Sequence, residues 1–305
     1  MSRPPEADLP IVPPPSTGVI HDIGYGHYDG PRLGRGYIRR SLFVDSARGA
    51  YGLGRTGRAK VMPMLLLVAM CLPALVIVVI TTLTGASELV GDYTSYVINL
   101  QIVIAIYVAG QAPVSVSRDL RFGVSSLYFS RPLERVDYVV AKFAALTSAI
   151  FLLVAAPLTI LLAGALVAKL PLSDQLPDYL RAMAGGLLVA LVLAGIGLVI
   201  AAMTPRRGLG VAAIISVLMV LAGVQGATQE IALQEGADNL AGYLGLLSPF
   251  TLVDGVQSRV LGADSVLLAP PPGTTGAVVF ALVVALVIAA SFAALLLRYR
   301  KVSVS

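Results

Sequence analysis

VMPMLLLVAMCLPALVIVVITTLT, residues 61–84, contains no charged side chain and is rich in Leu, Val and Ile. The hydrocarbon core of a bilayer is about 30 Å thick, and about 20 helical residues cross it at 1.5 Å per residue. A run of this length is therefore typical of a membrane-spanning helix. Of the 305 residues, 57% are hydrophobic and only 13% are charged, which places the whole chain among integral membrane proteins.

Five further runs of similar length and composition follow the first. The six predicted spans cover about 61–84, 94–114, 139–168, 181–203, 209–228 and 274–297. We therefore expect an all-α membrane protein with six transmembrane helices. Residues 229–272 lie between the last two spans and form a predicted external helical segment.

The distribution of Lys and Arg gives the expected orientation. Of the 22 basic residues, all but Lys169, Arg181 and Arg259 fall on one side of the six spans. Cytoplasmic loops carry this excess of positive charge, so both termini are expected in the cytoplasm. The net charge of +5 then reflects topology and does not indicate nucleic-acid binding.

The region before the first span is expected to lie on the cytoplasmic side. Residues 1–37 form a predicted tail, disordered at least over the Pro-rich segment 1–16. Residues 38–60 are predicted to form an amphipathic interfacial helix, with Arg39 and Arg40 reaching toward headgroups. A solvated linker is the alternative, because both arginines interrupt the apolar face.

Three possible chemical motifs were weighed. Gly52, Gly54 and Gly57 match GxGxxG, but no strand precedes them, so we interpret this segment as a flexible joint. The spacing of the His and Asp residues in 21–29 fits no standard metal site, and we predict none. No GxxxxGK[ST] motif occurs, so the sequence predicts neither an ATPase nor another enzyme, and no cofactor of its own.

The middle of each predicted span is neutral, but a few polar side chains lie within the spans. Such groups usually bond between helices, and they are also candidates for a substrate path. Asn99 and Gln101 lie on opposite sides of one helix, so at most one of them could face a given path. The candidate path residues are Asn99, Gln101, Tyr107 and Gln225.

A charged segment, RDLRFGVSSLYFSRPLER at 118–135, separates the second and third spans. Val116, Leu120, Val124 and Leu127 recur at helical spacing, which predicts an amphipathic cytoplasmic helix over about 115–131. Pro132 is expected to end it and to open the next helix, with Glu134 in the first turn. Tyr138 and Lys142 are then expected where that helix enters the bilayer.

This segment also resembles the loop after the second span in type-2 ABC transporter permeases. Their pattern is (E/D)R-x-x-G-T-x-x-x-L-x-x-(R)P-(I/L)-x-R-x-x-(Y)-x-x-x-K, in which Val124 replaces the frequent Thr. LSPF at 247–250 is similar to the family's external LSP(F) segment, and the resemblance spans about residues 38–300. The matching positions in the loop are Arg121, Gly123, Leu127, Arg131, Pro132, Arg135, Tyr138 and Lys142.

The resemblance implies the architecture of a type-2 ABC exporter permease, with cytoplasmic connecting and coupling helices. The implied coupling residues are Arg118, Asp119, Arg121, Phe122, Gly123, Leu127, Tyr128, Arg131 and Pro132. The implied connecting helix uses Arg39, Arg40, Leu42 and Phe43. The implied external gate holds Ser248, Pro249 and Phe250.

Implied partners are two copies of an ATP-binding subunit, which would hold ATP and Mg, and a second permease subunit, identical or different. Membrane lipids are expected around the spans. A neutral path would suit amphipathic or hydrophobic molecules such as antibiotics or lipids. Arg-rich, Lys-poor usage suggests a bacterial inner membrane. A membrane sensor that uses the ATPase for signalling, or a secondary carrier, are the alternatives.

Overall fold

The computed structural model describes residues 30, 33–121, 134–204 and 206–302, and in this part of the chain every regular element is a helix. Residues from Gly34 onward cluster as one unit, and Met1–Leu33 cluster separately. The coupling positions 122–133 and the His and Asp positions of 21–29 lie outside the described residues. The expectation of an all-α protein is confirmed.

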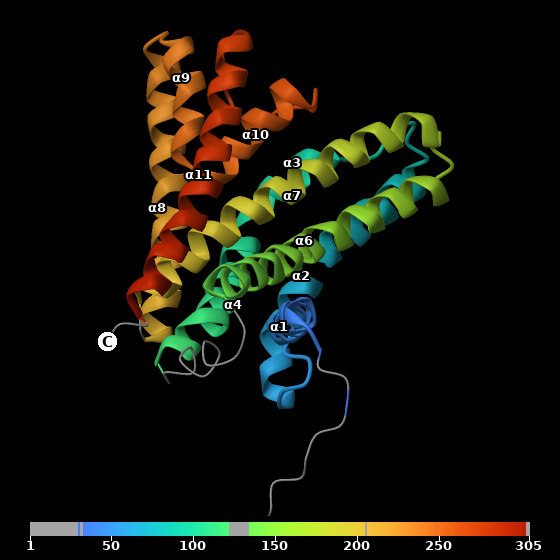
Figure 1. Ribbon diagram of the computed structural model, residues 1–305. Coiled ribbons are helices and arrows are strands. Elements are labelled where there is room, and N and C mark those ends of the chain that lie inside the picture. The colour runs from blue at the N-terminus through green and yellow to red at the C-terminus, as the bar shows by residue number, and fades with distance from the viewer. Residues whose placement is uncertain (1–29, 31–32, 122–133, 205, 303–305) are drawn as a thin grey trace, which may run out of the picture. The chain divides into compact units, whose positions relative to one another are not determined.

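Five long apolar helices could each cross a bilayer (Figure 1). They are α2 (Gly57–Thr84), α6 (Arg135–Val167), α7 (Leu172–Met203), α8 (Arg207–Gln234) and α11 (Gly273–Val302). α3 (Tyr93–Asn99) and α4 (Gln101–Arg121) together supply a sixth crossing if the pair counts as one span. The described chain is therefore a multi-pass integral membrane protein.

The second span is broken, which corrects the prediction of one continuous helix over 94–114. α3 and α4 meet at a 58° bend around Leu100. Two tyrosines tie α3 to other helices. The Tyr96 hydroxyl donates to the Met70 carbonyl of α2, and the Tyr93 hydroxyl is 2.9 Å from Oε1 of Gln175 in α7. These tethers hold α3 off the axis of α4.

The boundary between span and cytoplasmic helix also differs from the prediction. α4 shows no break at Val114 and continues to Arg121, so residues 115–121 prolong the spanning helix. α6 begins at Arg135 with Glu134 as its N-cap residue, one turn later than the predicted opening at Pro132. The helix predicted for 38–60 is shorter as well: α1 (Arg35–Ala50) ends before a turn, and α2 starts at Gly57.

The most apolar part of α7 is more buried than that of the other four long helices, and α7 packs along α6, α4 and α11. Small residues allow these close contacts. A Cβ on Gly197 would lie 2.8 Å from Val108 Cγ1 of α4, and one on Gly195 would lie 2.9 Å from Ser291 Cβ of α11. Such contacts permit extensive dispersion attraction between the helix backbones, which drives helix association where lipid replaces water.

Beyond α8 the segment predicted to be external folds into α9 (Asp238–Leu244), η1 (Gly245–Leu247) and α10 (Pro249–Val260). The buried Gln229 amide of α8 donates to the carbonyls of Ala241 and Ala269, at 3.0 and 3.1 Å. Asp254 of α10 is fully buried and accepts from Ser265 Oγ at 2.7 Å. The segment is therefore tied to the bundle by buried hydrogen bonds.

Candidate functional site

The candidate site is the face of α1 that is turned away from the spanning helices. α1 packs mainly on the first half of α6, with a smaller contact to α4. Leu42, Gly49 and Ala50 of α1 are buried against these helices. Burial of these residues stabilises one orientation of α1, so the opposite side of the helix is presented outward.

Tyr51 fastens the C-terminal end of α1. Its hydroxyl donates to the carbonyl of Ala149 in α6, at 2.7 Å, and its ring lies 5.7 Å from the ring of Tyr107 in α4. The Tyr107 hydroxyl donates to the Ala50 carbonyl at 3.5 Å. Burial raises the pKa of the Tyr51 phenol to about 12, so it remains protonated and able to donate at neutral pH.

Ion pairs fasten the N-terminal end. The guanidinium of Arg35 contacts Glu134 and Asp137, and Nη1 of Arg39 lies 3.9 Å from Oδ1 of Asp137. Hydrogen bonds to the two carboxylates raise the pKa of Arg35 above its ordinary value. The acids lie at the start of α6, where negative charge complements the helix dipole. α1 is thus held at both ends.

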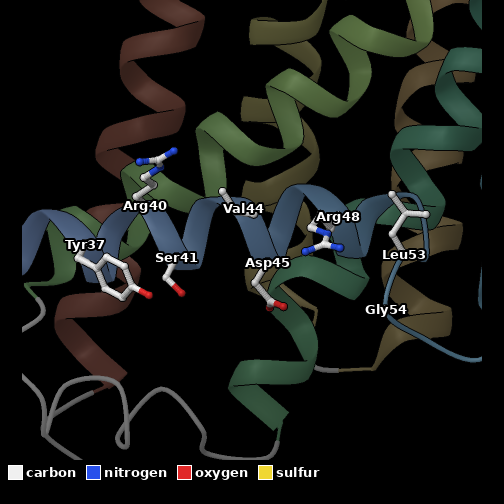
Figure 2. A pocket seen from close by; sticks show the side chains of 8 residues that line it. All are labelled: Tyr37, Arg40, Ser41, Val44, Asp45, Arg48, Leu53 and Gly54. Atoms are coloured by element: carbon white, nitrogen blue, oxygen red, sulfur yellow. The ribbon is translucent and has the colours of Figure 1, made fainter. Parts of the chain in front are cut away.

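The outward face of α1 is hollowed and charged (Figure 2). The hollow has a volume of about 550 Å³. Figure 2 shows Asp45 near Arg48 on the same side of α1, with Ser41 and Tyr37 further along the helix. The lining residues are Tyr37, Arg40, Ser41, Val44, Asp45, Arg48, Leu53 and Gly54.

Only one of the four predicted connecting-helix residues, Arg40, lines this hollow. Leu42 is buried and Phe43 packs against the core, while Arg39 pairs with Asp137. The prediction missed Tyr37 and Leu53 as outward residues. The recurrence of Tyr37, Ser41, Asp45 and Arg48 at helical spacing is a signal that could have found the outward stripe.

The predicted coupling residues are only partly described. Arg118, Asp119 and Arg121 lie in the last turns of α4. Phe122, Gly123, Leu127, Tyr128, Arg131 and Pro132 lie outside the described residues.

Tyr138 and Lys142 both lie near the start of α6, and their side chains are buried. Tyr138 is fully buried, and its ring packs edge-on against Tyr299 of α11 with centroids 4.9 Å apart. Lys142 is 8% exposed, and its ammonium lies 5.5 Å from the Tyr138 ring centroid. Both side chains therefore pack inside the bundle, and the cation stacks on an aromatic face.

The four predicted path residues do not gather at one place in the structure. Asn99 and Gln101 flank the bend between α3 and α4. Tyr107 is buried against the end of α1, and Gln225 donates to Gln229 of its own helix at 2.9 Å. Of the four, Tyr107 thus makes a contact between helices of the kind expected for packing, and the Gln225 bond lies within α8.

The predicted gate residues form the entry to α10. Ser248 is the N-cap residue, Pro249 is the first helical residue, and the Phe250 side chain is 1% exposed. The Thr251 hydroxyl donates to the Gly245 carbonyl at 2.8 Å and closes the turn. Pro is favoured at this first helical position because its missing N–H leaves no donor unsatisfied.

The described residues include no group of three or more His, Cys, Asp or Glu that could hold a metal ion. The outward face of α1 carries Arg40, Asp45 and Arg48. Its mixed charges and shallow hollow fit a protein contact better than a reaction centre.

A comparison with protein families matches residues 86–304 to the model of the ABC-2 family transporter proteins. No curated protein matches the chain. The match begins after α2, so α1 and α2 lie outside it, and it covers most of the chain. The resemblance seen in the charged segment and the helical architecture agree with it, and the chain belongs to the ABC-2 family, as a membrane permease subunit of an ABC transporter.

Proposed function

We propose that this permease exports amphipathic or hydrophobic molecules across a bacterial inner membrane, with both its termini in the cytoplasm. Two permease subunits, identical or different, work with two copies of an ATP-binding subunit. ATP and Mg bind in that partner, and this chain contributes the pathway and the docking surface. Membership of the ABC-2 family supports the partnership with an ATP-binding subunit.

The observation that carries this proposal is the double anchoring of α1. Tyr51 ties one end to α6 and α4, and Asp137 ties the other end through Arg35 and Arg39. A partner that pushes on the outward face therefore pushes on α6 directly. Packed helices move as rigid bodies, so the displacement would pass to the spans.

The outward face has the composition of a docking surface. Arg40 and Arg48 bring positive charge, Asp45 brings negative charge, and Tyr37 is an exposed aromatic residue. Interfaces are enriched in Tyr and Arg and are directed by complementary charge. Residues 115–131 provide the second expected docking element, as the family resemblance implies.

The exported molecule is expected to be largely apolar. The outer surfaces of α2 and α8 expose many aliphatic side chains, among them Leu65, Leu72, Val79, Val220 and Val224. These surfaces are suited to lipid or to the second permease subunit. Candidate path residues within the spans, such as Gln101, are neutral and offer only amide contacts.

Co-purification tests the proposal. A tagged permease is expressed with a candidate ABC ATP-binding subunit, and Arg40→Glu with Arg48→Glu is compared with Arg206→Glu. Arg206 is also basic and exposed but does not line the hollow. We expect the double variant to recover at least about tenfold less ATPase, since charge pairs at interfaces contribute about 1.5 kcal/mol or more, and the control to recover a normal amount.

If the unaltered permease recovers no ATP-binding subunit, the proposed partnership is wrong. A second measurement uses Arg121→Glu with Gly123→Pro, which should abolish the dependence of ATP hydrolysis on the permease. Substrate-stimulated ATP hydrolysis in liposomes, together with substrate movement, distinguishes an exporter from a sensor. Hydrolysis without movement would favour the sensor, and movement without ATP would favour a secondary carrier.

A further inference from the structure

A second hollow lies where the turn between α1 and α2 meets α4 and α8. Its volume is about 730 Å³. Three arginines from two elements line it, Arg55 and Arg58 around the start of α2 and Arg207 at the start of α8. Among the side chains that the structure describes, no acidic residue lines it. The hollow therefore concentrates positive charge in one place.

The arginines are available to a ligand. In the part of the chain that the structure describes, none of the three forms an ion pair with an acidic residue. The Arg55 guanidinium lies over Gly49, and a Cβ at Gly49 would be 2.9 Å from its Nη2 atom. The glycine thus leaves room for Arg55 at the edge of the hollow.

A buried amide lines the same hollow. Gln111 of α4 is 6% exposed, and its amide nitrogen has the Met62 sulfur at 3.7 Å as its hydrogen-bond partner. A thioether is a weak acceptor, so this buried donor is poorly satisfied. An oxygen atom of a ligand in the hollow would satisfy it better.

Two spanning helices also begin here. Thr56 is the N-cap residue of α2 and Arg206 that of α8, and neither side chain caps its helix with a hydrogen bond. The free N–H groups of a first turn and the positive end of the helix dipole attract anions. Both features add to the arginines and to Gln111.

We propose that this hollow binds a phosphate group, carried by the headgroup of an anionic phospholipid or by a soluble phosphate compound. Guanidinium groups bind phosphate through paired, charge-assisted hydrogen bonds. The uncharged runs of α2 and α8 begin at about residues 61 and 209, close to the residues that line the hollow, so a position at headgroup depth is expected. Met62, Pro63 and Val114 supply an apolar wall for the first acyl carbons.

Native mass spectrometry of the purified full-length chain measures binding of dioctanoyl phosphatidylglycerol, with dioctanoyl phosphatidylcholine and glycerol phosphate as comparison ligands. Arg58→Gln with Arg207→Gln removes two charges from the hollow. Arg40→Gln with Lys60→Gln removes two exposed charges at positions that do not line it. Gln111→Leu alters the buried amide without changing charge. Thermal unfolding verifies that each variant is folded.

The first double variant should bind phosphatidylglycerol at least about tenfold more weakly, because each charge-assisted hydrogen bond contributes about 1.5 kcal/mol or more. The second should change binding less than about twofold, as exposed charges contribute little. Gln111→Leu should weaken it about threefold. If glycerol phosphate binds as tightly as the lipid, and if Arg58→Gln with Arg207→Gln weakens that binding too, the phosphate group bound in the hollow belongs to a soluble compound. Equal losses in both double variants, no loss in either, or equal binding of phosphatidylcholine would overturn the proposal.

Discussion

Tyr51 gives the sharpest test of how α1 is held. Its side chain is 6% exposed, its hydroxyl donates to the Ala149 carbonyl at 2.7 Å, and its ring packs against Tyr107. Tyr51→Ala removes the ring and the hydrogen bond together. Truncating a buried aromatic side chain costs about 3–5 kcal/mol, and here that loss falls on the attachment of α1.

Hydrogen exchange of the amides in Arg35–Ala50 measures this attachment, because local opening of α1 exposes them to solvent. A loss of about 3–5 kcal/mol should accelerate exchange about a hundredfold or more. Tyr51→Phe keeps the ring and removes only the hydroxyl. A single hydrogen bond contributes about 0.5–1.5 kcal/mol, so this variant should exchange about two- to tenfold faster.

Tyr37→Ala is the matched control. Tyr37 is the same residue type in the same helix, but its side chain is 56% exposed on the outward face. Its removal should change exchange less than about twofold, as surface substitutions usually do. If Tyr51→Ala and Tyr37→Ala behave alike, the ion pairs at the other end hold α1, and the reasoning about Tyr51 is wrong.

Three further predictions concern the external segment. Asp254→Ala should lower the free energy of unfolding by about 1–3 kcal/mol in a detergent denaturation assay. The part-buried N–H of Val266 and the hydroxyl of Ser265 lose their acceptor, while the N–H of Leu267 keeps Ser265 Oγ at 3.1 Å. Burial raises the pKa of Asp254 above its ordinary value of 3.8, so the native state holds this proton more tightly than the unfolded state does. The stability due to this group is therefore present at acidic pH and is lost as pH rises through the folded-state pKa. The melting temperature of Asp254→Asn relative to the parent should increase as pH rises from acidic to neutral, and a decrease would contradict the sign. Gly185→Ala should destabilise the protein by about 1–3 kcal/mol, because the new Cβ would overlap the side chain of Gln257. Adding Gln257→Ala to this variant should restore the melting temperature. Adding it to Gly223→Ala, where the new Cβ meets no neighbouring atom, should not raise the melting temperature.

The spans were predictable because they follow from one requirement. A backbone inside lipid must satisfy its own hydrogen bonds, so a run such as 61–84 has to be helical and long enough to cross the bilayer. The same requirement does not say whether a span is straight. The bend at Leu100 depends on the contacts of Tyr93 and Tyr96 with other helices, and no local breaker such as Pro marks it in the sequence.

The candidate site was predictable only in outline. The resemblance and the pattern of charge place α1 and residues 115–131 on the cytoplasmic side, but helical spacing alone does not tell which stripe faces the bundle. α1 carries apolar residues on several sides, and the contacts with α6 decide that Leu42 is inside while Arg40 is outside. The sequence likewise did not show that the side chains of Tyr138 and Lys142 are buried, because Tyr and Lys are both common at membrane surfaces.

By itself the sequence determined the membrane class, the approximate positions of the long apolar helices and the uneven division of positive charge, because the bilayer imposes these on composition and order alone. Tertiary structure decided which side chains meet. Arg55, Arg58, Gln111 and Arg207 come from three separate stretches of the chain and share one hollow only because α2, α4 and α8 pack together at their ends. Residues that are far apart in the sequence become one site through packing, and no local pattern records that packing.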